Sequence, residues 1–321
     1  MRILAPHIAN LFFYGTSQGF DEFTLRQYLI ERELDVCNSN NWVSDSEYLE
    51  ILEVLIHKIN NPYFGLYYGS YLNIKALGLI AELSLNASSI EQAVILLQNY
   101  LDSTFPLVSL VISQNVEYYT LRLDCTLEDE ILKKHTLDTA FCFIYRELKL
   151  MLIDDDYPLL QLPYSDVDEY SSLLNSNIQK GNSHLIILRN KVLGTEINRK
   201  RVKEIEYLLP KFLMMINSEK IGYKNFSLQV RNMILNMCCP ELPTFEQISK
   251  QFPLSDRTIQ RKLTEEGLSF RKISDDVKRE LSYYLAKGKQ MKTQDIAHIL
   301  GYSEPSSYLH AVKRWDAFFE V

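Results

Sequence analysis

One sequence pattern occurs twice near the C-terminus: an isoleucine and a small residue lead into a turn that ends in serine. The first copy runs from Ile248 to Ser255 and the second from Ile296 to Ser303, so the two copies begin 48 positions apart. A serine side chain accepts hydrogen bonds from the free N–H groups that open a helix. Each copy therefore predicts a helix, a turn and a second helix that follows the serine, which together make a helix-turn-helix unit.

In the first copy, the helix expected after Ser255 separates apolar from polar side chains. Ile259 and Leu263 are four positions apart and share one face. The opposite face carries residue types that reach base edges in the DNA major groove, namely Arg257, Gln260, Arg261 and Thr264. A plain helical hairpin needs the two apolar residues, but it needs neither the polar face nor a second copy of the pattern. The sequence therefore predicts DNA binding.

The corresponding face of the second copy is less charged and carries Ser306, Ser307, His310 and Lys313. A bidentate Arg or Gln contact discriminates between bases by about 1–3 kcal/mol, whereas serine is less selective. We therefore expect the first copy to provide sequence specificity and the second mainly to position the protein on DNA.

These residues resemble the AraC/XylS family of bacterial transcription regulators over roughly residues 240–315. The resemblance is carried by Ser255–Leu263, Glu266–Phe270, Ile296-Ala297, Gly301–Ser307 and Lys313–Trp315. Between these stretches, the four-residue spacing of Ile273, Val277, Leu281 and Leu285 predicts one long helix, Phe270–Lys287. The resemblance implies that this helix holds two helix-turn-helix units in an all-α domain. The two units would then enter successive major grooves, about 34 Å apart. It also implies double-stranded DNA and RNA polymerase as partners.

Three positions depart from this family pattern. Pro253 stands where a turn glycine is usual, and because proline cannot adopt a positive φ, the first turn must use another geometry or shift by a residue. His310 stands where an arginine is common. The chain ends at Phe318–Val321 without the usual family ending, so the last helix is expected to be less well supported.

A second resemblance lies upstream, to the effector-type (arabinose-binding-type) N-terminal domain of one branch of this family. It is carried by Asn61–Leu66, Gly69, Gly78, Ser88–Ala93, Leu162–Tyr164 and Leu185–Leu188. It implies that a small-molecule effector binds the N-terminal domain.

Apolar periodicity predicts an α+β fold for the N-terminal region. Helices are expected at 21–33, 44–60, 88–101, 127–153, 202–216 and 226–238, and strands at 107–112, 116–123 and 184–188. An all-β cupin-like barrel would need many more strands. Pro240 and Pro243 suggest a stiff linker, so we expect an effector-binding or dimerisation domain at 1–239 and a DNA-binding domain at 240–321.

Charge is unevenly distributed along the chain. The net charge is −7, from 34 basic and 41 acidic residues, and residues 240–321 contain 13 of the former and 12 of the latter. The expected DNA-binding domain is therefore nearly neutral, so its attraction to phosphates should be modest and sensitive to salt.

Sixteen of the twenty tyrosines precede residue 240. Tyr63, Tyr67 and Tyr71 either line an effector pocket or simply pack the helix that follows. A domain that dimerises or binds a partner without any ligand remains an alternative, and a small-molecule enzyme is a more distant one. The chain has no glycine-rich phosphate loop and no histidine pair at metal-binding spacing, so no cofactor, metal ion or catalytic activity is expected.

The helix expected at Val202–Ile216 is apolar around more than one stripe, which suggests a homodimer contact, although burial within one subunit would explain it equally well. The acidic run Asp154–Asp156 is interpreted as a solvated loop. Five cysteines without a paired framework, with no signal peptide and no membrane-length apolar run, indicate a cytoplasmic protein.

Overall fold

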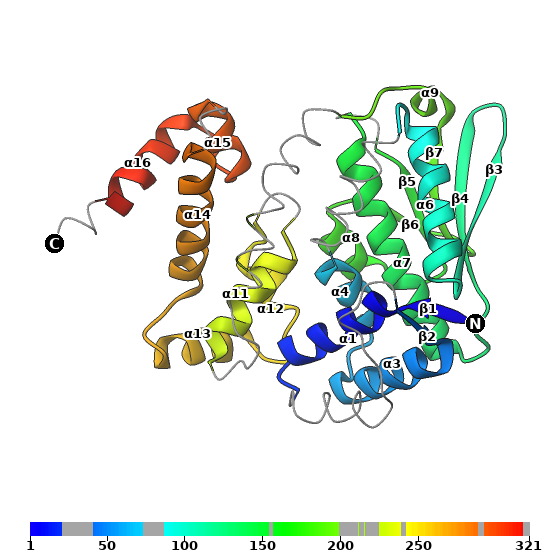
Figure 1. The fold of residues 1–321 in the computed structure, drawn as a ribbon, viewed down its shortest axis with the longest axis horizontal. Coiled ribbons are helices and arrows are strands. Elements are labelled where there is room, and N and C mark those ends of the chain that lie inside the picture. Colours follow the sequence, from blue (N-terminus) through cyan, green and yellow to red (C-terminus); the bar gives the residue numbers. More distant parts are fainter. Residues whose placement is uncertain are drawn as a thin grey trace. The chain divides into compact units, whose positions relative to one another are not determined.

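The computed structural model describes residues 1–20, 41–72, 87–153, 157–198, 211, 215, 225–238, 242–287 and 292–316. The chain forms two compact units, Met1–Val202 and Lys203–Val321, each of which is described by itself. The first unit mixes helices and a sheet, and the described elements of the second are helices (Figure 1). The division precedes the expected domain boundary at 239/240, and helix α11 (Phe226–Asn236) packs against other helices of the second unit.

The first unit is built around a five-stranded sheet with the strand order β3-β4-β7-β5-β6. Neighbouring strands are antiparallel except for the parallel pair β5 and β6. The strands are β3 (Val108–Gln114), β4 (Tyr118–Cys125), β5 (Leu159–Leu162), β6 (Ile178–Lys180) and β7 (His184–Arg189). The strands expected at 107–112 and 116–123 are confirmed as β3 and β4, which pair with Leu110 opposite Leu123, and the gap between them lies at 115–117 rather than at 113–115.

Helices α6 (Ile90–Thr104) and α7 (Glu130–Met151) pack against this sheet. Along β3 and β4, buried Leu110 and Leu121 alternate with exposed Val111 and Arg122, so one face of these strands is covered and the other meets solvent. Ser89 caps α6 and Asp129 caps α7 through side-chain oxygens that accept backbone N–H groups. Both helices were expected from apolar periodicity. Two short helices follow, α8 (Asp168–Leu174) and α9 (Asn190–Leu193).

The start of the chain adds β1 (Arg2–Leu4), α1 (Ala5–Ser17), β2 (Trp42–Ser44), α3 (Asp45–Ile59) and α4 (Phe64–Tyr71). Ser44 and Glu47 form a reciprocal capping box at the start of α3. Helix α4 lies directly on α7 because Gly65 and Gly69 have no side chain. A Cβ atom at Gly69 would lie 2.7 Å from the backbone oxygen of Thr139, and one at Gly65 would clash with the backbone oxygen of His135.

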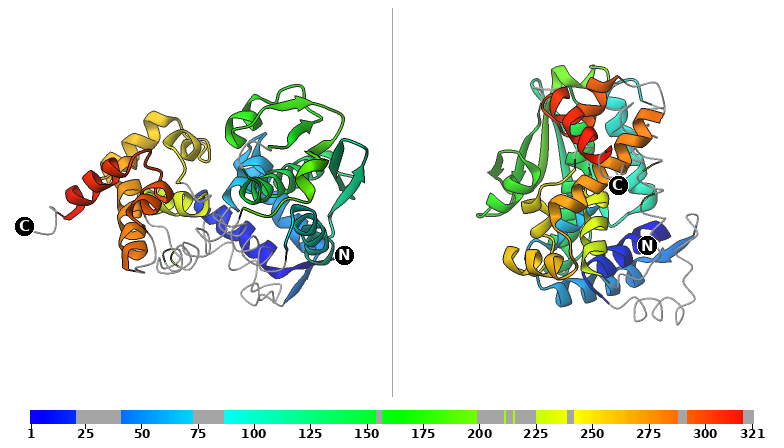
Figure 2. Two further views of the ribbon diagram at one scale, coloured as in Figure 1. Left: turned by 90° about the horizontal axis from the view of Figure 1, so that it is seen from above. Right: turned by 90° about the vertical axis from the view of Figure 1, so that its left-hand side faces the viewer.

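The described elements of the second unit are α11, α12 (Phe245–Ser249), α13 (Asp256–Glu265), α14 (Phe270–Lys287), α15 (Thr293–Ile299) and α16 (Pro305–Asp316). Helix α14 confirms the predicted long helix, and its residues Ile273, Val277, Leu281 and Leu285 are buried. The two views of Figure 2 and that of Figure 1 place α13 at one end of α14 and α15 with α16 at the other.

Several expected elements lie outside the described residues: the helix at Asp21–Glu33, the run Asp154–Asp156 and almost all of Val202–Ile216. Within the described ranges, no helix has both the length and the apolar character that crossing a membrane requires.

Candidate functional site

The turn between α12 and α13 differs from the turn between α15 and α16. The first closes with hydrogen bonds of the i→i−3 type, from the amide of Gln251 to Ile248 and from that of Phe252 to Ser249, both at 3.1 Å. No residue from 250 to 255 has a positive φ, whereas Gly301 in the second turn has a φ of 75°. The expected change of geometry at Pro253 is thus confirmed, because a tightened 3₁₀-type ending replaces the left-handed residue.

The two expected serine caps have different outcomes. Ser255 caps α13 as predicted, since its side-chain oxygen accepts the amide of Thr258 at 3.3 Å. Helix α16 begins at Pro305, so Glu304 and not Ser303 immediately precedes it. The expectation for Ser303 was wrong by one position, because proline is well suited to the first helical residue, where no backbone N–H is needed.

Helix α13 separates its side chains as the sequence predicts. Ile259 and Leu263 are 0% and 1% exposed. The other side of the helix is exposed to solvent and carries Arg257, Gln260, Arg261 and Thr264. The Arg261 Nε lies 3.8 Å from a carboxylate oxygen of Glu265, and both side chains are well exposed. Such a pair contributes little free energy, so Arg261 is available to another partner.

Helix α16 also has one buried and one exposed side. Tyr308, Ala311 and Trp315 are buried. The four residues singled out from the sequence are all exposed: Ser306, Ser307, His310 and Lys313. The structure therefore presents each of the two sets of predicted residues on the solvent side of one helix.

Three contacts that the sequence analysis missed hold α16 and its preceding turn on α14. The Tyr308 hydroxyl lies 2.8 Å from the Ser282 hydroxyl in a buried pair. The guanidinium of Arg314 donates to Asp275 at 2.9 Å. The ammonium of Lys278 stands 4.6 Å from the centre of the Tyr302 ring, and burial lowers the pKa of this lysine. These contacts fix the orientation of the exposed side of α16 relative to α14.

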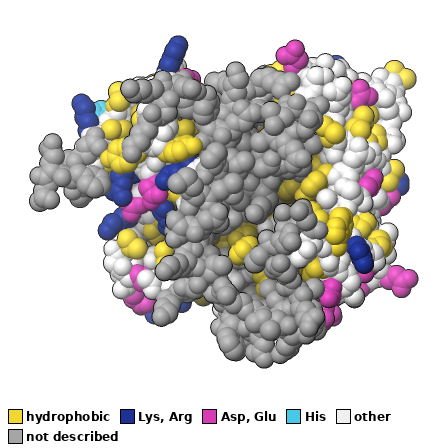
Figure 3. Space-filling view, in the orientation of Figure 1, with side chains coloured by type: hydrophobic (Ala, Val, Ile, Leu, Met, Phe, Trp, Pro, Cys, Tyr) yellow, Lys and Arg dark blue, Asp and Glu magenta, His cyan; other side chains and the backbone are white. Residues whose placement is uncertain are grey.

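The surface charge of the second unit is mixed. In the view of Figure 3, Lys and Arg side chains of this unit lie among Asp and Glu side chains. This arrangement agrees with the nearly neutral sequence composition of residues 240–321. Attraction to a polyanion must therefore depend on where individual cations stand rather than on net charge.

In the first unit, the three predicted effector tyrosines do not point to one place. The Tyr67 hydroxyl donates to Glu169 at 2.6 Å, and that of Tyr63 to Asp166 at 3.4 Å, both near α8. Tyr71 instead packs against Tyr14 of α1, with ring centres 5.1 Å apart. Tyr71 therefore fits the alternative in which these tyrosines serve to pack helices. The effector role of all three stays a prediction.

A buried polar cluster near Tyr63 and Tyr67 was not foreseen. At its centre is Asp138 of α7, which is 1% exposed. Its carboxylate accepts hydrogen bonds, all within 2.9 Å, from Lys134, Tyr164, Tyr170 and His184. Burial alone would raise the pKa of Asp138, but the hydrogen bond from His184 and the charge of Lys134 outweigh it and hold that pKa below its usual value. The cluster joins α7 to α8 and β7.

The sequence offered one weak signal for this cluster, the four-residue spacing of Lys134 and Asp138 on one helix. The other partners are separated from Asp138 by 26 to 46 residues. Only the folded chain brings them together.

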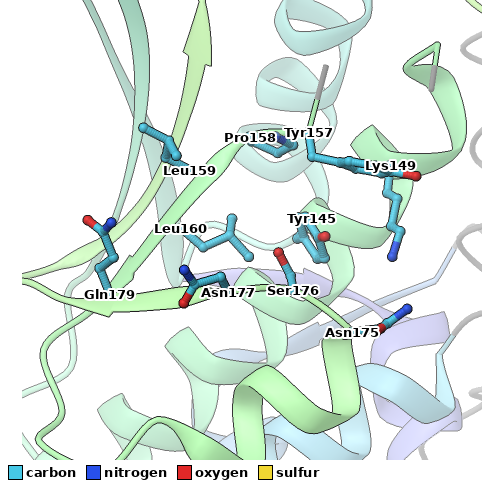
Figure 4. Close-up of a pocket in the computed structure, with 10 residues that line it drawn as sticks. All are labelled: Tyr145, Lys149, Tyr157, Pro158, Leu159, Leu160, Asn175, Ser176, Asn177 and Gln179. Atoms are coloured by element: carbon cyan, nitrogen blue, oxygen red, sulfur yellow. The ribbon is translucent and has the colours of Figure 1, made fainter. Parts of the chain in front are cut away.

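A cavity of about 370 Å³ lies between the C-terminal half of α7, strand β5 and the segment that leads from α8 into β6 (Figure 4). The described residues that line it are Tyr145, Lys149, Tyr157, Pro158, Leu159, Leu160, Asn175, Ser176, Asn177 and Gln179. None of these residues was singled out from the sequence. The cavity combines apolar, aromatic and amide surfaces with one cation, as small-molecule sites commonly do.

Comparison with known proteins gives the following relationships. Residues 24–194 match the family described as the arabinose-binding domain of AraC transcription regulators, at their N-terminus. The HTH-type transcriptional regulator VqsM of Pseudomonas aeruginosa is 31% identical over 83 residues, 26% of each chain. An uncharacterized HTH-type transcriptional regulator of Mycobacterium tuberculosis is 34% identical over 73 residues, 23% of this chain and 21% of that one. The matched part thus spans about a quarter of these relatives. The transcriptional regulator CdpR from Pseudomonas aeruginosa aligns over 92% of this chain and 95% of its own, with 19% identity and a TM-score of 0.40.

Proposed function

The chain belongs to the AraC family of transcription regulators, with an N-terminal part of the arabinose-binding type, and from this premise we propose that its second unit binds double-stranded DNA in a sequence-specific manner. The helix pairs α12–α13 and α15–α16 are then two helix-turn-helix units within residues 240–321. The observation that carries this proposal is the exposed side of α13, where Arg257, Gln260 and Arg261 stand opposite the buried Ile259 and Leu263.

In this proposal, α13 reads bases and α16 mainly positions the protein. Arginine and glutamine make bidentate contacts to guanine and adenine, so Arg257, Gln260 and Arg261 contact base edges and Thr264 supports them. On α16, Lys313 contacts phosphate, while Ser306, Ser307 and His310 face the groove. Helix α14 sets the distance between α13 and α16, supported by the Tyr308–Ser282 and Arg314–Asp275 contacts.

The test compares specific with random DNA. A preferred site is selected from a random duplex library with the full-length chain, and binding is measured by fluorescence anisotropy at two salt concentrations. The substitution Arg261→Ala should weaken binding to the selected site by about 1–3 kcal/mol and relax the preference at one or two base pairs. Equal weakening on selected and random duplexes would reduce Arg261 to a phosphate contact and remove its assigned role.

The matched control is Arg122→Ala, which removes the same charge from an exposed strand of the first unit, where Arg122 pairs with Asp124. It should leave both affinities unchanged. If Arg122→Ala weakened binding as much as Arg261→Ala, long-range charge rather than contact by α13 would explain the effect.

The first unit is proposed to bind a small-molecule effector, and the chain is proposed to act as a homodimer that also contacts RNA polymerase. A second tethered copy raises the effective concentration of the DNA-binding unit. This gain is important here because residues 240–321 are nearly neutral. Sedimentation of the full chain at micromolar concentration tests the dimer: a monomer in the presence and absence of the selected DNA would contradict it.

A further inference from the structure

One large apolar side chain of helix α16 faces solvent. Leu309 is 48% exposed, and among the described residues of the second unit it is the only large apolar side chain that is strongly exposed. Nearby in the same helix, Tyr308 and Ala311 are 5% and 4% exposed. The fold therefore buries the apolar side chains near Leu309 but leaves Leu309 itself in contact with water, where a partner that covers it gains free energy.

Contacts with α14 hold Leu309 in this exposed position. The hydroxyl of Tyr308, the preceding residue, lies 2.8 Å from that of Ser282 in a buried pair. The guanidinium of Arg314 donates to Asp275 at 2.9 Å. Successive helix residues point about 100° apart, so Leu309 cannot turn inward while Tyr308 stays beside Ser282.

Leu309 shares its side of α16 with polar residues that are proposed to face DNA. Ser306 precedes it by three positions and Lys313 follows it by four, and all three side chains are exposed. No residue from 305 to 315 is acidic, and the last turn of α16 carries Lys313 and Arg314. This side therefore matches a negatively charged partner that also presents an apolar group.

The major groove of DNA meets both requirements. Phosphates flank the groove, and each thymine places a C5 methyl group in it, which apolar side chains contact. We propose that Leu309 contacts the C5 methyl group of a thymine and makes α16 selective for an A·T pair. The Ser306 hydroxyl, beside it, can bond to either base of that pair. This inference rests on the proposed DNA binding, and it adds a discriminating contact to a helix otherwise assigned to positioning.

The exposed side of α13 has a different chemistry. It carries Arg257, Gln260 and Arg261, whose side chains contact base edges through hydrogen bonds. Within the described range of this helix, no large apolar side chain is strongly exposed. The dependence on a thymine methyl group should therefore lie under α16, about one helical turn, or roughly ten base pairs, from the bases that α13 contacts.

The test removes single methyl groups from the DNA. Each thymine of the duplex selected with the full-length chain is replaced in turn by deoxyuridine, which keeps the base pair and lacks only the C5 methyl group. Fluorescence anisotropy then measures the affinity of the chain for each duplex. For the wild type, one replacement in the α16 part of the site should weaken binding about fourfold, as expected for one methyl group removed from water.

Variants of Leu309 connect this loss to one side chain. Leu309→Ala should weaken binding to the thymine duplex about fourfold or more, and it should bind the deoxyuridine duplex as well as it binds the thymine duplex. Leu309→Met keeps an apolar side chain of similar volume and should stay sensitive to the methyl group. In Leu309→Arg, loss of the methyl contact should offset part of the gain from the added charge. Ile131→Ala truncates an equally exposed apolar side chain of the first unit, which is 55% exposed, and should match the wild type.

The same measurements separate this inference from the proposed function. A selected duplex that loses affinity with Arg261→Ala but depends on no thymine methyl group would overturn the inference alone. So would a Leu309→Ala variant that remains as sensitive to deoxyuridine as the wild type. If Leu309→Ala bound every duplex with wild-type affinity, Leu309 would be left for a protein partner and the inference would also be wrong. A chain that selects no duplex would refute the proposed function and this inference with it.

Discussion

The Glu266 carboxylate accepts the backbone amide of Ser227 at 2.9 Å, and its other oxygen accepts that of Phe226 at 2.7 Å. Glu266 directly follows α13, whereas Ser227 lies in the first turn of α11. One acidic side chain therefore satisfies two of the free N–H groups that open α11 and places its charge at the favourable end of the helix dipole. Helix α11 is thereby attached to the end of the proposed base-reading helix.

We predict that Glu266→Gln lowers the free energy of unfolding of the second unit by about 1 kcal/mol, as loss of a helix cap does. Partial burial raises the pKa of Glu266, but the hydrogen bonds from Ser227 and Phe226 lower it by more. The pKa of Glu266 therefore lies below its usual value of 4.5. A carboxylate whose pKa is lowered by folding stabilises the folded state at pH values above 4.5. This stabilisation is lost as the pH falls through the lowered pKa. The difference between wild type and variant should therefore shrink below pH 4.5.

The measurement uses the two tryptophans of the chain. In a Trp42→Phe background, fluorescence reports the buried Trp315 of the second unit during urea unfolding. Glu265→Gln is the matched control, since Glu265 makes only the exposed pair with Arg261. An unchanged midpoint for Glu266→Gln, or an equal change in the control, would show that this cap does not stabilise α11.

The Asp138 cluster leads to a second stability prediction. Asp138→Asn keeps the shape of the side chain but removes the charge that faces Lys134 and His184. Breaking a buried ion pair costs about 3 kcal/mol or more, because the remaining partners stay desolvated. Asp124→Asn, which removes an exposed pair with Arg122, should cost less than about 1 kcal/mol. Trp42 fluorescence in a Trp315→Phe background follows the first unit, and similar costs for the two variants would contradict a central role for Asp138.

The close approach of α4 to α7 gives a third prediction. Gly65→Ala would place a methyl group against the backbone of His135, which cannot move without shifting α7. We expect a loss of about 2 kcal/mol or more from the unfolding free energy of the first unit, because a clash with backbone is not relieved by a change of rotamer. Gly194→Ala is the control, since nothing lies within 4 Å of the added atom. Equal stability of the two variants would show that α4 can move away at little cost.

Local patterns predicted much of this fold. Apolar spacing located α3, α6, α7 and α14 to within a few residues, because an amphipathic helix is determined largely by its own residues. Alternating strands separated by a short polar turn located β3 and β4 in the same way. Strands β5 and β6 were not expected. They are four and three residues long, and the parallel pairing of β6 with β5 leaves no local signature in the sequence.

The candidate sites also differ in whether their residues lie close together in the sequence. The exposed sides of α13 and α16 were predictable because all their residues lie on one helix at fixed spacing. The cavity beside α7 and the Asp138 cluster join residues from α7, the segment before α8 and the later strands. Their composition depends on strand order, which helical periodicity does not determine. The attachment of α11 to the other helices of the second unit was also not apparent from the sequence, because it depends on the long-range contact between Glu266 and Ser227.

The last prediction concerns His310, which is exposed on α16 at a position where the resembling family often has arginine. His310→Arg adds a permanent cation on the side proposed to face DNA. Affinity should rise for selected and random duplexes alike, and one added phosphate contact should steepen the salt dependence by about 0.9 in log Kd per log salt. The matched control is Leu309→Arg, which adds the same charge at the adjacent exposed position. Successive helix residues point about 100° apart, so this arginine should have a smaller effect. Unchanged affinity and salt slope for His310→Arg would show that α16 does not reach the groove.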